Sequence, residues 1–126
     1  MTPGVPSSPD GVFRSATAVQ PLYPGGANSH SPGTNSRWSG AIAEGWDIAG
    51  NANGGYLLAL TARAMSAAVD RPDPVTVTAH YLAPGKPGPV SISVDIDKQG
   101  RVLGTATAAL LAEDRPLLKV LGTFGQ

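Results

Sequence analysis

The chain has 126 residues, no net formal charge and only 14% charged residues, which fits one domain with a single hydrophobic core. Nine Lys and Arg balanced by nine Asp and Glu argue against nucleic acid as a partner, because phosphate binding needs clustered basic residues. The lack of Cys excludes disulfides, thiolate metal sites and Cys nucleophiles, and with only two His we expect neither a metal nor another cofactor.

The N-terminal region is rich in turn-forming residues. Residues 1–10 alternate Pro with small polar residues, which predicts a disordered tail before a domain at 11–126. The start lacks the basic and apolar regions of a secretory signal, and no apolar run approaches the roughly 20 residues that cross a bilayer. We therefore expect a cytoplasmic protein with no membrane partner. Residues 12–20 predict a short first strand, and residues 24–36 a long loop.

The clearest helix is predicted over residues 54–69, where Ala, Leu and Met dominate. Asn53 is a good N-cap, and Pro72 disfavours helical geometry beyond Asp70. Most surface helices have a charged face, but this segment carries a single charge, Arg63. A helix that is apolar on almost every side should be buried on most sides.

The remainder of the chain predicts β-structure. Residues 75–82 alternate, with Tyr81 on one face and His80 on the other, and a Pro/Gly-rich loop follows at 83–89. Residues 90–97 alternate even more clearly, with Val and Ile facing inward. Turns at 98–100 and 113–115 would then separate further strands at 101–112 and 116–124.

One long apolar helix before an antiparallel sheet of four or five strands indicates an α+β fold. A curved sheet wrapped around the helix would bury both the apolar face of the sheet and most of the helix. This is the hotdog arrangement. A β-sandwich with an incidental helix is the alternative, and it explains the length and apolarity of the helix less well.

The segment from Trp46 to Tyr56, Trp-Asp-Ile-Ala-Gly-Asn-Ala-Asn-Gly-Gly-Tyr, resembles the acyl-CoA thioesterase-like family of hotdog proteins. His80-Tyr-Leu-Ala-Pro-Gly85 and the ending Leu121-Gly-Thr-Phe-Gly125 strengthen the resemblance. It covers roughly residues 36–126 and is closest to the N-terminal module of the double-hotdog thioesterases. It implies hydrolysis of acyl-CoA, or a related acyl thioester, to a free fatty acid and CoA, as part of fatty acid metabolism.

The helix start has chemistry that does not depend on the resemblance. The first N–H groups of a helix lack intrahelical partners, and the helix dipole is positive there. Gly54 and Gly55 have no side chains to keep a ligand away from these groups. A thioester carbonyl could approach closely and be polarised, which is also the role that the resemblance implies. Alternatively, the glycines allow the helix to pack tightly against a strand.

Hydrolysis also requires a group that activates water, and residues 54–69 contain no Asp or Glu. In double-hotdog relatives, the resemblance implies, the acid comes from the C-terminal module. Within this chain, Asp47 could fold back toward the helix start, or it is an exposed loop carboxylate. His80 could act as a general base, or it lies on the outer sheet face or at a module interface. Asn53 could hold a water, although its capping role alone explains it.

Four further residues are candidates for binding the substrate: Trp46, Tyr56, Tyr81 and Gly85. Trp46 and Tyr56 could line an acyl pocket, and core positions explain them equally well. Tyr81 and Gly85 belong to the His-Tyr-Leu-Ala-Pro-Gly segment that carries the resemblance.

Three functions are compatible with these residues. The first is an acyl-CoA thioesterase, or half of one. The second is a non-catalytic acyl-CoA-binding or scaffold module, because the helix has no acid. The third is a dehydratase or hydratase, which needs a His and an acid near the helix; Asp47 and Asn51 only weakly resemble that pattern. An unpaired sheet edge should favour a homodimer or pairing with a second hotdog module.

Overall fold

The computed structural model describes residues 11–22, 35–48 and 50–126. The predicted tail at 1–10 and most of the predicted loop at 24–36 therefore lie outside the described residues. No helix in the described ranges is long and apolar enough to span a membrane.

The first described segment is a short helix, α1 (Gly11–Ala16), followed by the two-residue strand β1 (Gln20–Pro21). The strand predicted over residues 12–20 is therefore wrong. The helical turn is held by contacts distant in sequence: the Tyr56 hydroxyl donates to the Ala16 carbonyl at 2.7 Å, and the Phe13 ring meets Trp46 edge to face. Such tertiary contacts override the modest strand preference of Val12 and Phe13.

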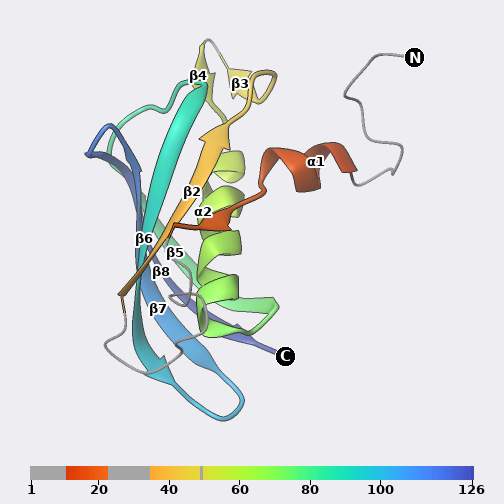
Figure 1. Cartoon of the computed structure of the whole chain (residues 1–126), viewed down its shortest axis with the longest axis vertical. Helices are drawn as coiled ribbons and strands as arrows, with labels where there is room; N and C mark the ends of the chain where they lie inside the picture. The colour runs from red at the N-terminus through yellow and green to blue at the C-terminus, as the bar shows by residue number, and fades with distance from the viewer. Residues whose placement is uncertain (1–10, 23–34, 49) are drawn as a thin grey trace.

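Six strands form one antiparallel sheet in the order β1-β2-β6-β7-β8-β5, and β3 with β4 forms a separate hairpin. Figure 1 shows the strands of the large sheet curving along one side of the long helix α2, with α1 on the opposite side of that helix. One curved sheet packed on one helix is the predicted α+β hotdog arrangement. The strands after β1 span Asn35–Ile42 (β2), Asp47–Ile48 (β3), Asn51–Ala52 (β4), Asp73–Tyr81 (β5), Gly88–Gln99 (β6), Gly104–Ala112 (β7) and Arg115–Gly125 (β8).

The alternation predicted for the central strand is confirmed, because Val90, Ile92, Val94 and Ile96 are all buried on β6. The turn after this strand comes later than predicted. β6 continues through Gln99 by means of a bulge between Ile96 and Lys98, and the chain reverses at 100–103 instead of 98–100. The Gly100 amide closes that turn by donating to the Leu103 carbonyl at 2.8 Å.

Helix α2 (Gly54–Val69) agrees with the predicted bounds, with Asn53 as its N-cap and Asp70 as its C-cap. One face packs on β6, β7 and β8, and Leu60, Met65 and Val69 are completely buried there. The opposite face lines an open groove, but Gly55 and Ala67 are the only exposed residues of the helix, so α2 is buried or half-buried on most sides, as predicted. The start of the helix and this outer face are the two regions that bear on function.

Candidate functional site

Asn53 caps α2 through its side chain. The Asn53 Oδ1 atom accepts from the Gly55 amide at 2.8 Å and from the Tyr56 amide at 3.3 Å. The Leu57 amide donates to the Asn53 carbonyl at 3.0 Å and begins the regular helical bonding. Two of the amides that lack intrahelical partners are therefore satisfied by the cap.

The Gly54 amide is different. No described residue accepts a hydrogen bond from it, although its neighbours on both sides are bonded. The Asn53 amide donates to the Trp46 carbonyl at 2.7 Å, which fixes the chain as it enters the helix. Of the two glycines predicted to present donors to a thioester, Gly54 has a donor with no acceptor in the described part of the chain, and Gly55 uses its donor for the cap.

A pocket of about 340 Å³ lies at this end of α2. It is lined mainly by apolar groups, with Asn51 and Tyr81 as the polar side chains. No carboxylate or imidazole is among the residues that line it: Asn51, Ala52, Gly54, Leu57, Tyr81, Leu82, Ala83, Pro84 and Gly85. An apolar pocket lined by Gly54, whose amide has no acceptor among the described residues, can hold a carbonyl group and attached hydrocarbon.

Tyr81 closes one side of the pocket. Its hydroxyl donates to the Gly54 carbonyl at 2.7 Å, and a Cβ atom at residue 54 would lie 3.3 Å from its ring. Gly54 therefore allows the helix to pack tightly against a strand, as the alternative interpretation of the glycines expected. The same absence of a side chain would allow a ligand to approach the backbone here, so the two interpretations are compatible.

Gly85 is buried at the far side of the pocket. Its carbonyl accepts from the Ala52 amide at 2.7 Å, which joins the loop after β5 to the β3–β4 hairpin. A Cβ atom there would lie 3.1 Å from Ile42 and 3.3 Å from Leu117. Gly85 thus shapes the pocket through its backbone and through the lack of a side chain.

The structure separates the two candidates for the general base. Asp47 lies in the β3–β4 hairpin opposite Ala52, a residue of the pocket lining, and is exposed. His80 pairs in register with exposed Lys119, whereas its neighbours Ala79 and Tyr81 pair with buried Val120 and Leu118. His80 therefore lies on the face of the sheet that points away from α2.

Trp46 and Tyr56 lie behind the helix start and not in the pocket lining. Their rings stack at 5.4 Å and 11°, and Phe13 of α1 meets Trp46 edge to face at 5.5 Å. The Tyr56 hydroxyl also accepts from the Ala43 amide at 2.9 Å. These contacts attach α1 to α2, so the placement of both residues is that of packing groups.

Sequence reasoning missed most of the apolar lining, including Leu57, Leu82 and Pro84. Leu57 follows the glycines by one helical turn, and the other two lie inside the segment that carries the resemblance. The signal that could have found them is the pairing of Ala52 with Gly85, which a single sequence does not reveal. No group of three or more metal-binding side chains occurs in the part of the chain that the structure describes.

Several solved structures share this fold. A candidate thioesterase II from Thermobifida fusca YX is 26% identical, with a TM-score of 0.77 over 90% of this chain and 38% of that protein. The phenylacetic acid degradation protein PaaI of Thermus thermophilus, in a mutant form, is 21% identical, with a TM-score of 0.72 over 91% and 98% of the two chains. This chain thus spans well under half the length of the Thermobifida protein.

A hypothetical thioesterase from Streptococcus pneumoniae TIGR4, solved with coenzyme A, is 19% identical, with a TM-score of 0.69 over 86% and 87% of the two chains. No match was found among curated proteins. The family model described as the acyl-CoA thioesterase N-terminal domain matches residues 42–125, which is most of the chain. The chain therefore belongs to the acyl-CoA thioesterase N-terminal domain family.

Proposed function

We propose that this chain hydrolyses acyl-CoA, or a related acyl thioester, to a free carboxylic acid and a thiol at the start of α2. Membership of the thioesterase family supports acyl thioester hydrolysis in general. The observation that carries the specific site is Gly54, which lines the apolar pocket and whose amide has no acceptor among the described residues.

The reaction needs stabilisation of a negative oxygen. Water attacks the thioester carbonyl carbon, the carbonyl oxygen becomes negatively charged, and the carbon–sulfur bond then breaks as the thiolate leaves and takes up a proton. The Gly54 amide would donate to that oxygen, with the positive end of the α2 dipole behind it. One fixed donor of this kind contributes about 3 kcal/mol to lowering the barrier.

The group that activates water is expected from outside this chain's helix. Neither α2 nor the pocket lining contains Asp or Glu. A second hotdog module or a second copy would supply the carboxylate, as the family resemblance implies. Asp47 is the candidate from this chain, since its strand adjoins the pocket through Ala52.

Pairing with a second module is supported by the edge strand β5. This nine-residue strand bonds to β8 on one side and ends the sheet on the other. Its apolar side chains Val75 and Tyr81 are 58% and 52% exposed, which is unfavourable for a monomer in water. We expect a dimer in light scattering at micromolar concentration; a clean monomer mass would contradict the homodimer.

Release of free thiol from a series of acyl-CoA thioesters, short to long, tests the activity. We expect turnover by the purified chain, alone or with its paired module, with at least one chain length. Failure with every length and at every protein concentration would refute the proposal.

A non-catalytic acyl-CoA-binding module is the second candidate, favoured by the absence of a carboxylate from the pocket lining. The site would then bind the thioester through the same amide and pocket without turning it over. Calorimetry with a non-hydrolysable acyl-CoA thioether measures binding, and thiol release from the matching thioester measures turnover. Tight binding of the thioether with no thiol release from the thioester supports the module, whereas thiol release from the thioester supports the enzyme.

A further inference from the structure

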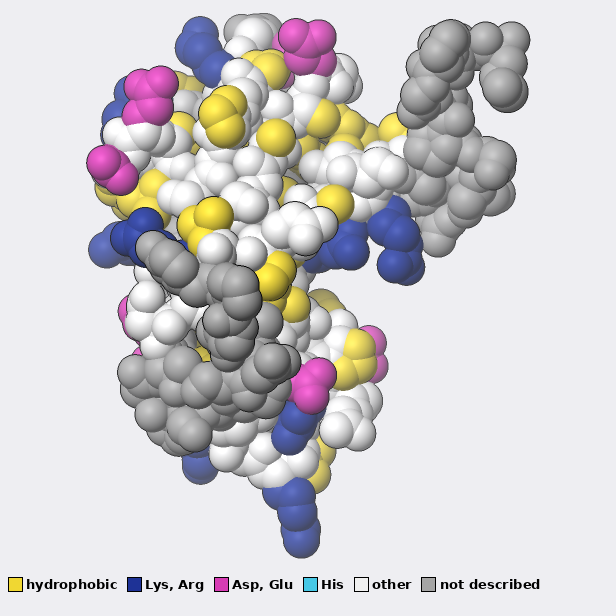
Figure 2. Space-filling model, viewed as in Figure 1, with side chains coloured by type: hydrophobic (Ala, Val, Ile, Leu, Met, Phe, Trp, Pro, Cys, Tyr) yellow, Lys and Arg dark blue, Asp and Glu magenta, His cyan; other side chains and the backbone are white. Residues whose placement is uncertain are grey.

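Three aromatic rings from segments distant in sequence meet behind the start of α2. The Trp46 ring stacks on Tyr56 of the helix at 5.4 Å and 11°, and Phe13 of α1 meets the same indole edge to face at 5.5 Å and 67°. Tyr56 is buried, Trp46 is half-buried and Phe13 is exposed. Figure 2 shows yellow hydrophobic side chains where α1 joins the upper part of the molecule. In this ring cluster of Phe13, Trp46 and Tyr56, the indole is held by one ring of the helix and by one ring of α1.

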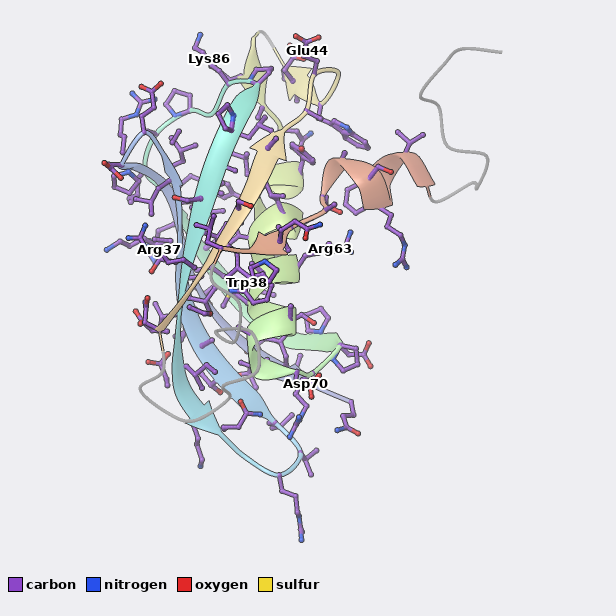
Figure 3. All side chains as sticks on the ribbon, in the orientation of Figure 1. Arg37, Trp38, Glu44, Arg63, Asp70 and Lys86 are labelled. Carbon is purple, nitrogen blue, oxygen red and sulfur yellow. The ribbon has the colours of Figure 1, made fainter. Side chains whose placement is uncertain are left out.

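Hydrogen bonds fasten α1 to α2 beside the ring cluster. The Tyr56 hydroxyl donates to the Ala16 carbonyl at 2.7 Å. Further along α2, Arg63 Nη1 donates to the Arg14 carbonyl at 2.8 Å and to Thr17 Oγ1 at 3.0 Å. Figure 3 shows Arg63 on the side of the helix that faces α1. The position of α1 against the helix is therefore set by directional bonds as well as by ring contacts.

The backbone of Trp46 connects the ring cluster to the helix start. The Asn53 amide donates to the Trp46 carbonyl at 2.7 Å. The Gly54 N–H belongs to the next peptide unit, which is planar and begins at the Cα atom of Asn53. The direction of the Gly54 N–H therefore depends on how Asn53 is held, and so on the Trp46 carbonyl.

The bond to Trp46 differs from the other bonds of Asn53. The Asn53 side chain accepts from the Gly55 and Tyr56 amides, and its carbonyl accepts from the Leu57 amide, so these bonds tie it to its own helix. In the described part of the chain, Trp46 is the one residue outside α2 with which Asn53 forms a hydrogen bond. A fixed donor stabilises developing charge best when its direction is set before the reaction, so an anchor outside the helix has a direct bearing on the donor.

We propose that Trp46, held in place by Phe13, is a positioning residue for thioester hydrolysis and acts through the Gly54 amide. This role rests on the proposed function, in which that amide donates to the negative oxygen. Loss of the Phe13 ring frees the indole, loosens the bond between Trp46 and Asn53 and spreads the direction of the Gly54 N–H. Catalysis then slows, whereas substrate binding changes little, because none of the three rings lines the pocket at the helix start.

Phe13→Ala tests this role, and Val12→Ala is the matched control. Both residues lie in α1 and are 44% and 49% exposed, but Val12 is not part of the ring cluster. We expect Phe13→Ala to lower kcat for acyl-CoA hydrolysis about tenfold with KM within about twofold of the wild type. Val12→Ala should keep the wild-type kcat, and Phe13→Tyr should restore it because the ring is retained. Equal kcat values for Phe13→Ala and Val12→Ala would overturn the proposal.

A double-mutant comparison separates positioning of the donor from a general loss of structure. Gly54→Pro removes the amide hydrogen through which the ring cluster is proposed to act. In that background Phe13→Ala should lower kcat by less than about twofold, because no donor is left to misalign. The same fall in kcat with and without the Gly54 amide would overturn the proposal, since Phe13 would then affect activity by another route.

Amide hydrogen exchange of the full chain, measured by NMR, distinguishes failure of this proposal from failure of the proposed function. Phe13→Ala should speed exchange of the Asn53 amide about tenfold relative to Val12→Ala, while the Leu60 amide in the body of α2 keeps its wild-type rate. That result would support the positioning even if no thioester were turned over. Unchanged exchange at Asn53, or equally faster exchange throughout α2, would refute the positioning, and hydrolysis by the wild type would then leave the proposed function standing.

Discussion

At the C-terminal end of α2, side chains donate hydrogen bonds to backbone carbonyls at and near the helix end. At its N-terminal end, one backbone amide has no acceptor among the described residues. The Arg71 guanidinium donates to the carbonyls of Asp70, Gly100, Arg101 and Val102 at 2.9–3.3 Å. Gln99 Nε2 donates to the Val69 carbonyl at 3.0 Å. These bonds satisfy carbonyls at and beyond the helix end.

The N-terminal end uses a single side chain, Asn53, and leaves the amide of Gly54, a residue of the pocket lining, without an acceptor among the described residues. A helix held firmly at one end can present an unsatisfied donor at the other without fraying. On the proposed function, the closed, C-terminal end contributes mainly to stability and the open, N-terminal end mainly to catalysis. Variants at the two ends should therefore affect different measurements.

The largest expected effect is on catalysis, from Gly54→Pro. Proline removes the amide hydrogen yet is favoured at the first position of a helix. It also requires an extended residue before it, and Asn53 already has φ −59° and ψ 134°. Loss of the donor should lower kcat for thioester hydrolysis about 100- to 1,000-fold.

Gly54→Ala is the matched control, since it adds the same Cβ against the Tyr81 ring but keeps the N–H. We expect Gly54→Ala to retain at least ten times the kcat of Gly54→Pro in the thiol-release assay. Equal rates for the two variants would show that the Gly54 amide does not act on the carbonyl.

At the closed end, Arg71→Met should lower the free energy of unfolding by about 2 kcal/mol. Methionine retains much of the aliphatic stem but removes every donor that Arg71 offers to the 100–103 turn. A hydrogen bond to a charged group contributes about 1.5–3 kcal/mol, and only one of these bonds is partly buried, so we expect the loss to equal about one such bond. Urea unfolding at fixed protein concentration measures this change.

Arg101→Met provides the control for Arg71, because Arg101 is exposed in the same turn and its side chain has no hydrogen bond among the described residues. Its stability should stay within about 0.5 kcal/mol of the wild type. An Arg71→Met variant with wild-type stability and a lowered kcat would contradict the view that the C-terminal end of α2 contributes mainly to stability.

The sequence predicted α2 closely, because Asn53, the Ala and Leu content and Pro72 are local signals that agree with one another. It also predicted the buried residues of β6 through their alternation. The difference between Gly54 and Gly55 follows from the cap rule as well: a capping oxygen accepts from the second and third helical amides and leaves the first.

The parts that the sequence did not predict depend on distant partners. α1 is helical next to Tyr56 and Trp46, which lie some distance along the chain. The role of Arg71 requires the 100–103 turn to lie beside the end of α2, and the groove requires α1, β5 and β8 to meet around that helix. Tertiary proximity of this kind leaves no local pattern in one sequence.

The smallest expected effect concerns Asn53, and it sharpens the comparison within the open end. Asn53→Ala removes the acceptor for the Gly55 and Tyr56 amides and should cost about 1 kcal/mol of stability. Asn53→Asp keeps the acceptor and therefore avoids that cost. Its negative charge at the positive end of the dipole should raise the stability by a few tenths of a kcal/mol.

The two Asn53 variants should have opposite effects on stability and activity. The carboxylate of Asn53→Asp would lie near the oxygen on which negative charge develops, so kcat should fall although the fold is at least as stable. Asn53→Ala leaves the Gly54 amide in place and should keep more activity despite its lower stability. Urea unfolding and thiol release on the same samples measure both quantities. If kcat instead followed stability across the pair, the helix start would affect activity through the fold and not through its charge.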